Sequence, residues 1–167
     1  MLQPRVIELI EQSFEPLRHN ASRFTRVFYE RLFEVDPTLK KLFIRDIREQ
    51  RKKFFRKMDF IIKHLTDPEK LEPDLQELGS RHDYYKVSRD DYRTFFSAFL
   101  YALSAAMGKK FTPEVREAWY ELCEYIACLM SPEINSEKGL MLLGKKEERA
   151  QIAEDKIKQE QKEAELA

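Results

Sequence analysis

The chain has 167 residues, which is the usual size of about one domain. Its 30 basic and 30 acidic residues balance, and this excludes a globally basic nucleic-acid binder. Four glycines are too few for the turns of β-hairpin folds or for a dinucleotide-binding loop.

The composition also bears on the compartment. The apolar runs are too short for a membrane-spanning helix, and residues 1–12 mix charges with apolar side chains, unlike a secretory signal. Two cysteines, Cys123 and Cys128, cannot form a disulfide framework, and we expect both to be buried thiols. We therefore expect a cytoplasmic protein without a membrane or nucleic-acid partner.

Helices are predicted along the chain from apolar side chains that recur with the helical period. The expected spans are residues 4–17, 20–35, 37–43, 46–65, 68–83, 88–108 and 112–130. Three starts have a capping residue followed by proline: Asp36-Pro37, Asp67-Pro68 and Thr112-Pro113. Ser88 with Asp91 resembles a capping box at another start. No segment alternates like a strand, so the predicted fold class is all-α.

Two polar side chains fall on the apolar stripes of the earlier helices. Tyr29 lies among phenylalanines within 20–35, and Gln50 lies one turn before Phe54. A buried phenol and a buried amide each need a hydrogen-bond partner. Either each reaches a backbone carbonyl or water, or both point into one pocket.

A basic run begins after the first of these helices and continues into the second. Residues 38–57 contain nine Lys and Arg against Asp46 and Glu49. A nucleic-acid or partner-binding patch would have this charge, but the aromatics needed for base stacking fall on the buried side. We therefore interpret the run as a solvated helix face.

His82 lies on an apolar stripe with Leu71, Leu75 and Leu78 at helical spacing. The plainer interpretation is a core histidine satisfied by a neighbour, and the alternative is a metal or cofactor ligand. No second protein ligand lies on this stripe, whereas a zinc site would need several. A lone imidazole suits haem, because the pyrrole nitrogens supply further ligands and one iron position stays open.

The packed domain is expected to span residues 1–132, since the apolar stripes need one another to form a core. Residues 133–167 form a charged C-terminal extension. Its later part is mostly Lys, Glu, Gln and Ala, which is typical of a solvated helix or a disordered tail.

The order of these residues resembles a globin, over about Ile7 to Met130. The similarity is to bacterial single-domain globins and to the haem domain of flavohaemoglobins. It is carried by FYERLF at 28–33, DP at 36–37, LKKLF at 39–43, QR at 50–51, LGSRH at 78–82, Val87 and AW at 118–119. The resemblance implies a globin fold, a three-over-three helical sandwich, with haem b as the cofactor.

The resemblance also implies roles for individual residues. His82 would be the iron ligand, and Tyr29 and Gln50 would line the distal side over the open iron position. Six further side chains would bind or enclose the cofactor: Phe43, Phe54, Leu78, Val87, Tyr92 and Phe95. Of the flavohaemoglobin pattern's proximal tyrosine and glutamate, Tyr92 matches the first, whereas the position of the second falls near Ser136.

The expected function is reversible binding of dioxygen, with other diatomic gases as further ligands, in a monomer or homodimer. Nitric oxide dioxygenation is a further expectation and would use an external reductase, because no sequence remains to bind FAD or a nicotinamide. The alternative is a haem-based gas sensor that signals through residues 133–167. A third hypothesis is a helical adaptor without haem.

Overall fold

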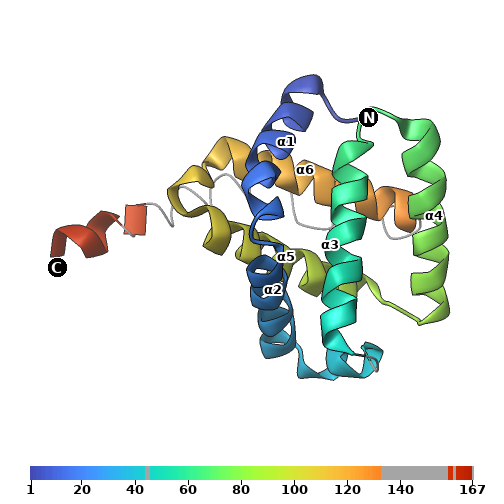
Figure 1. Cartoon of the computed structure of the whole chain (residues 1–167). Helices are drawn as coiled ribbons and strands as arrows, with labels where there is room; N and C mark the ends of the chain where they lie inside the picture. Colours follow the sequence, from blue (N-terminus) through green and yellow to red (C-terminus); the bar gives the residue numbers. More distant parts are fainter. Residues whose placement is uncertain (44–45, 133–157, 160, 167) are drawn as a thin grey trace.

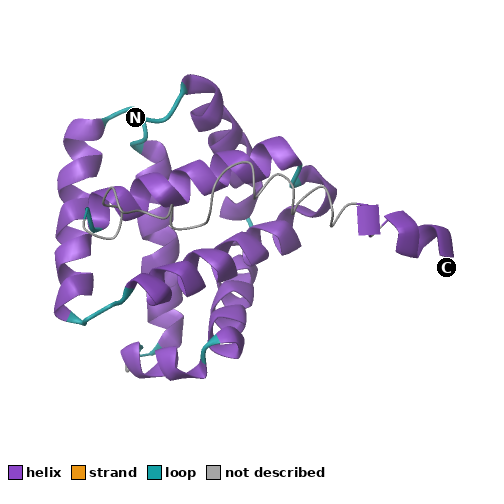
Figure 2. Cartoon of the chain, turned by 180° about the vertical axis from the view of Figure 1, so that it is seen from behind, coloured by secondary structure: helices purple, strands orange, loops and turns teal. Residues whose placement is uncertain are grey.

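A computed structural model describes residues 1–43, 46–132, 158–159 and 161–166 of the chain. The regular structure in this described part is helical, without a strand (Figure 2). The elements are α1 Pro4–Arg18, α2 Ala21–Val35, η1 Pro37–Leu42, α3 Ile47–Lys63, α4 Pro68–Tyr84, α5 Arg89–Met107, η2 Gly108–Lys110 and α6 Pro113–Met130. The predicted all-α class and order of helices are confirmed, although the segment after Asp36 is a 3₁₀ helix. No helix in the described ranges combines the length and apolarity needed to cross a bilayer.

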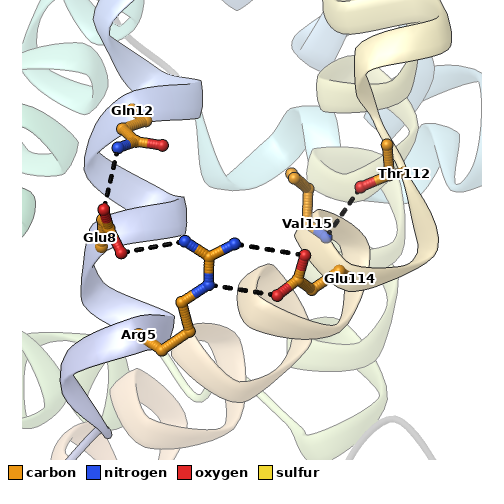
Figure 3. Close-up of polar contacts among 6 residues, drawn as sticks. All are labelled: Arg5, Glu8, Gln12, Thr112, Glu114 and Val115. Atoms are coloured by element: carbon orange, nitrogen blue, oxygen red, sulfur yellow. Dashed lines mark hydrogen bonds and ion pairs between the residues drawn. The ribbon is translucent and has the colours of Figure 1, made fainter.

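Local capping explains where several helices begin. The side chain of Asp36 accepts a hydrogen bond from the Thr38 backbone N–H in the first turn of η1. The side chain of Thr112 accepts one from the Val115 backbone N–H in the first turn of α6 (Figure 3). Ser88 and Asp91 form a reciprocal capping box at the start of α5. Asp67 takes the expected position before α4, but its side chain makes no capping bond. The predicted starts are therefore confirmed, with three of the four capped by side chains.

The α-helices form two layers of three (Figure 1). α1, α3 and α4 make one layer, and α2, α5 and α6 make the other. α2 packs along α5 within its layer, while α1 and α4 pack on α6 and α3 packs on α2 across the layers. This is the three-over-three sandwich expected from the sequence.

One core fills the space between the layers. Trp119 of α6 is fully buried at its centre, with its ring 5.7 Å from Phe99 and 6.2 Å from Phe14, centroid to centroid. Its indole N–H donates to Ser13 Oγ at 2.9 Å, which satisfies the polar atom that burial would otherwise leave unpaired. The expected single core is present.

Gly79 sets the distance between α4 and α6. A Cβ at this position would lie 1.8 Å from the carbonyl oxygen of Met130, so the two backbones touch where a side chain cannot fit. His82 follows Gly79 by three residues on α4. The close approach therefore fixes where His82 stands against the core.

Ion pairs also join neighbouring helices, and two of these pairs involve α4 or α6. Lys57 Nζ of α3 lies 2.7 Å from Asp74 Oδ2 of α4, and both side chains are partly buried. Arg5 of α1 binds Glu114 of α6 at 3.2 Å on the exposed surface (Figure 3). The first pair ties α4 to α3, whereas the second contributes little because solvent screens it.

The two cysteines differ in exposure. Cys123 is buried, but Cys128 is exposed, so the prediction of two buried thiols is wrong for Cys128. Five residues along a helix rotate the side chain well away from the first face, here toward solvent.

In the extension, residues 161–166 are helical and exposed, while residues 133–157 lie outside the described part. The domain boundary at residue 132 stays a prediction.

Candidate functional site

Tyr29 and Gln50 meet between α2 and α3. Tyr29 lies on the buried face of α2 and is 2% exposed, and Gln50 lies in the first turn of α3. The Gln50 side-chain Nε2 donates to the Tyr29 hydroxyl oxygen at 3.3 Å. The two polar side chains thus partner each other, and their sharing of one pocket stays a prediction. Within the described residues, the Tyr29 hydroxyl hydrogen has no acceptor.

Burial controls the protonation of Tyr29. Removal from water raises the pKa of the phenol to about 12, and the hydrogen bond from Gln50 opposes this rise without cancelling it. The phenol is therefore neutral and protonated at physiological pH. It can act as a hydrogen-bond donor to a ligand beside it.

Aromatic rings enclose this pair. The ring centroids of Phe43, at the end of η1, and Phe54, on α3, lie 5.5 and 5.9 Å from that of Tyr29. Phe54 also contacts Phe95 of α5 edge to face, at 5.6 Å. Three of the expected wall residues are thus gathered beside Tyr29, and their rings make its surroundings apolar.

His82 stands near the C-terminal end of α4 with one ring nitrogen committed. Its Nδ1 lies 2.8 Å from the backbone carbonyl oxygen of Leu78. A carbonyl oxygen can only accept, so Nδ1 carries the hydrogen and Nε2 holds a lone pair. Burial lowers the pKa of His82, which further favours the neutral ring. A neutral imidazole held in this way is the usual form of a metal-binding histidine.

Tyr92 of α5 lies next to His82 of α4, with 6.1 Å between the two ring centroids. Its hydroxyl is buried and has no hydrogen-bond partner among the described residues. Burial first, and the charge of Asp83 second, raise its pKa to about 12. An unpaired buried hydroxyl costs roughly 1–3 kcal/mol, so it marks a place that a polar group would fit.

Leu78 and Val87 flank His82 along the chain. Both are partly buried against the core. The backbone N–H of Val87 donates to the carbonyl oxygen of His82 at 3.1 Å, which closes the turn after α4. Lys86 inside this turn has a φ of 57°, in the left-handed region that non-glycine residues rarely adopt. The turn therefore brings Val87 back to the histidine.

The two polar ends of the site are separate. Tyr29 and His82 are joined by a series of neighbouring rings: Phe54, Phe95, Phe96 and Tyr92. Phe96 was not predicted as a site residue, although its position one turn after Tyr92 could have indicated it. The ring series makes one continuous aromatic region with a phenol at one end and an imidazole at the other.

Arg51 was predicted as part of the basic run and of the QR pair at 50–51 that resembles a globin, without a contact assigned to it. Its Nε donates to Thr25 Oγ1 at 3.2 Å, and its Nη2 contacts the carbonyl oxygen and the Oγ of Ser22. These bonds clamp the start of α3 onto the start of α2, one residue from Gln50. No local pattern in the sequence signals a contact of this kind.

The donor set fits an iron porphyrin. The described residues contain no cluster of three or more His, Cys, Asp or Glu side chains that could hold a bare metal ion. A metal held by His82 must therefore bring its other ligands with it, as haem iron does. The neutral imidazole, the apolar rings and the unpaired Tyr92 hydroxyl all suit such a group.

Comparison with known proteins agrees with this architecture. A sequence model of the Globin family matches residues 26–129. Neuroglobin from Chaenocephalus aceratus is 30% identical over 138 residues, covering 74% of this chain and 87% of that protein. A neuroglobin from Danio rerio is 28% identical, with coverages of 74% and 86%. The flavohemoprotein of Rhodopirellula baltica is 28% identical over 76% of this chain but only 32% of its own length. The chain therefore belongs to the globin family, and haem-based binding of a diatomic gas comes with that membership.

Proposed function

We propose that this globin holds haem b through His82 and binds dioxygen reversibly. The observation that carries the proposal is the hydrogen bond from His82 Nδ1 to the Leu78 carbonyl oxygen. It leaves Nε2 as the free donor atom and fixes the plane of the ring. When bound, haem supplies an iron centre with one open position for a diatomic gas.

Tyr29 and Gln50 would select among gases. A dioxygen ligand in this site would carry partial negative charge, and the Tyr29 hydroxyl would stabilise it as a charge-assisted hydrogen-bond donor. Such a bond contributes about 1.5–3 kcal/mol, or roughly 10- to 150-fold in affinity. Carbon monoxide is less polar and gains less. Gln50 donates a hydrogen bond to the phenol oxygen and so would orient the hydroxyl.

The apolar residues would hold the cofactor and keep it dry. Phe43 would lie against the porphyrin, with five further side chains as walls: Phe54, Leu78, Val87, Tyr92 and Phe95. These roles are supported by the partial or full burial of the residues and by the ring contacts of Phe54 with Phe95 and of Tyr92 with His82. Exclusion of water protects the ferrous state from oxidation.

Absorption spectra of the ferric, ferrous and carbonmonoxy forms test the proposal. The purified chain supplied with haem should show a Soret band, and His82→Ala should lose haem uptake or change the spectra of all three forms. His19→Ala is the matched control, since His19 is exposed and lies outside the aromatic region. An unchanged spectrum in His82→Ala would exclude this ligand. No Soret band after haem addition would leave a helical adaptor instead.

Nitric oxide dioxygenation is a second candidate, supported by the similarity to a flavohemoprotein and by the Tyr29–Gln50 pair. One nitric oxide, one dioxygen and one electron give one nitrate, so the reaction needs a reductase, which we propose is a separate protein. Nitrate formed per electron consumed, with an added flavin reductase, measures this activity.

The alternative of a gas sensor needs an output segment. The sequence assigns that role to residues 133–167, and residues 133–157 lie outside the described part of the chain. Removal of the extension separates the two functions, because a dioxygen binder keeps its gas kinetics and cellular effect while a sensor loses its output.

A further inference from the structure

A cavity of about 470 Å³ opens at the corner where α1 leads into α2. It shares no lining residue with the aromatic region around Tyr29 and His82. Three arginines line it, Arg23, Arg26 and Arg51, together with His19, Asn20 and Ser22. No carboxylate is among the lining residues, so the corner gathers positive charge on a chain that is neutral overall.

Arg51 is built into this cavity. Its guanidinium reaches across from α3 and is fixed by bonds to Thr25 Oγ1 and to the backbone and side chain of Ser22. A guanidinium that is already ordered loses less rotamer entropy when it binds a ligand than a free surface side chain does. It therefore provides a fixed point for an anion.

Arg23 and Arg26 face the same cavity from α2. Both are exposed, and neither makes an ion pair with a carboxylate in the described residues. Three guanidinium groups around one cavity repel one another, and an anion between them would relieve this repulsion. Planar guanidinium groups bind phosphate oxygens in pairs, which favours phosphate over a simple halide.

The backbone at this corner adds donors. Asn20 occupies the N-cap of α2, but its side chain makes no capping bond. The first N–H groups of α2 therefore lack a side-chain acceptor, and they border the arginine cavity. Phosphate groups bind at such helix starts when cations are also present.

We propose that the cavity at the α1–α2 corner binds a small phosphate-bearing anion through Arg23, Arg26 and Arg51. The depression is open to solvent, and its volume of about 470 Å³ leaves room for such an anion. The site is independent of the proposed haem site, although Arg51 follows Gln50 directly on α3. An anion here would hold together the two helices that carry Tyr29 and Gln50.

Titration of the full chain with sodium pyrophosphate at fixed ionic strength tests the proposal. Calorimetry should give saturable binding, and NMR should show shifts of the Arg51 side-chain N–H and of the backbone N–H groups of residues 21–23. Arg26→Gln should weaken binding by roughly tenfold or more, because a charge-assisted hydrogen bond is lost. Arg56→Gln removes the same charge from α3 outside the cavity and should leave the affinity unchanged.

The remaining outcomes are equally informative. No saturable binding, or equal weakening by both variants, would overturn the site and leave a diffuse basic surface. Vesicles of phosphatidylcholine with phosphatidylserine form a second arm. The full chain could sediment with these vesicles, lose this binding in Arg26→Gln and show no response to pyrophosphate. That result would overturn the small anion as the ligand and favour a lipid surface. Circular dichroism of the variants checks the fold. We expect Arg26→Gln to keep it, because the Arg26 side chain is exposed.

Discussion

The hydrogen bond from Gln50 to Tyr29 uses the phenol oxygen as acceptor and leaves the hydroxyl hydrogen available for donation to a proposed gas ligand. The amide nitrogen is 3.3 Å from the phenol oxygen and occupies one of its lone pairs. Burial raises the pKa of the phenol to about 12, so the hydroxyl keeps its hydrogen. A gas that accepts hydrogen bonds should therefore be distinguished from one that does not.

Tyr29→Phe should speed dioxygen release by roughly tenfold or more, because it removes one charge-assisted hydrogen bond. The ring contacts with Phe43 and Phe54 are kept, since phenylalanine has the same ring. Carbon monoxide release should change much less. Stopped-flow displacement of each gas from the ferrous protein measures both rates.

Tyr101→Phe is the matched control for this substitution. Tyr101 is 49% exposed, and its ring contact with Arg31 does not need the hydroxyl. Its dioxygen release should equal that of the unchanged chain. If Tyr29→Phe also releases dioxygen at the original rate, the phenol does not face the gas.

At the scale of elements, the position of α4 depends on the absence of a side chain at Gly79. Alanine inside a helix is usually more stable than glycine by up to about 1 kcal/mol. Here the added Cβ would lie 1.8 Å from the Met130 carbonyl oxygen, so α4 must move away from α6. We expect Gly79→Ala to lower the free energy of unfolding by about 1–3 kcal/mol, as overpacking does. Urea unfolding measures this change.

Ser80→Ala tests whether the effect belongs to the helix contact. Ser80 is exposed beside Gly79, and its hydroxyl bonds only to the carbonyl oxygen of Gln76 in the same helix. This substitution should keep or slightly raise stability, since alanine has the better helix propensity. Equal losses from both variants would mean that the contact with α6 is not the cause.

The sequence predicted the elements better than their contacts. The capping box of Ser88 and Asp91 is a local signal, and the start of α5 follows from it. The stripe that ends at His82 is also local, because helical spacing alone puts it on the buried side. The approach of Gly79 to Met130 and the clamp of Arg51 on Thr25 join residues far apart in the chain. No periodic pattern encodes such distances, so packing had to reveal them.

The site shows the same division. Tyr29 and Gln50 stood out because polar side chains on apolar stripes need partners, and their bond supplies one. The sequence could not show that Tyr29 and Gln50 partner each other, because this contact depends on how α2 packs against α3. The role of His82 as an iron ligand came from the resemblance, and the bond at Leu78 supports that proposal without testing it.

At the scale of the whole molecule, the described core lies entirely within the helical domain. Every residue that is buried in the described ranges falls between Ile7 and Ser131. The described residues of the extension, 158–159 and 161–166, are exposed. Among the described residues, those that pack the two layers together therefore all precede the predicted boundary at 132.

A chain that ends after Pro132 should unfold with a free energy within about 0.5 kcal/mol of the full chain, as expected when no core contact is lost. Its rates of dioxygen binding and release should also be unchanged, because Tyr29, Gln50 and His82 are all retained. Urea unfolding and stopped-flow mixing of both chains measure these quantities. A loss of several kcal/mol would show that the extension packs on the domain and that the boundary lies later. Equal stability and gas kinetics, with loss of a cellular response to the gas, would assign the extension a signalling function and favour the sensor.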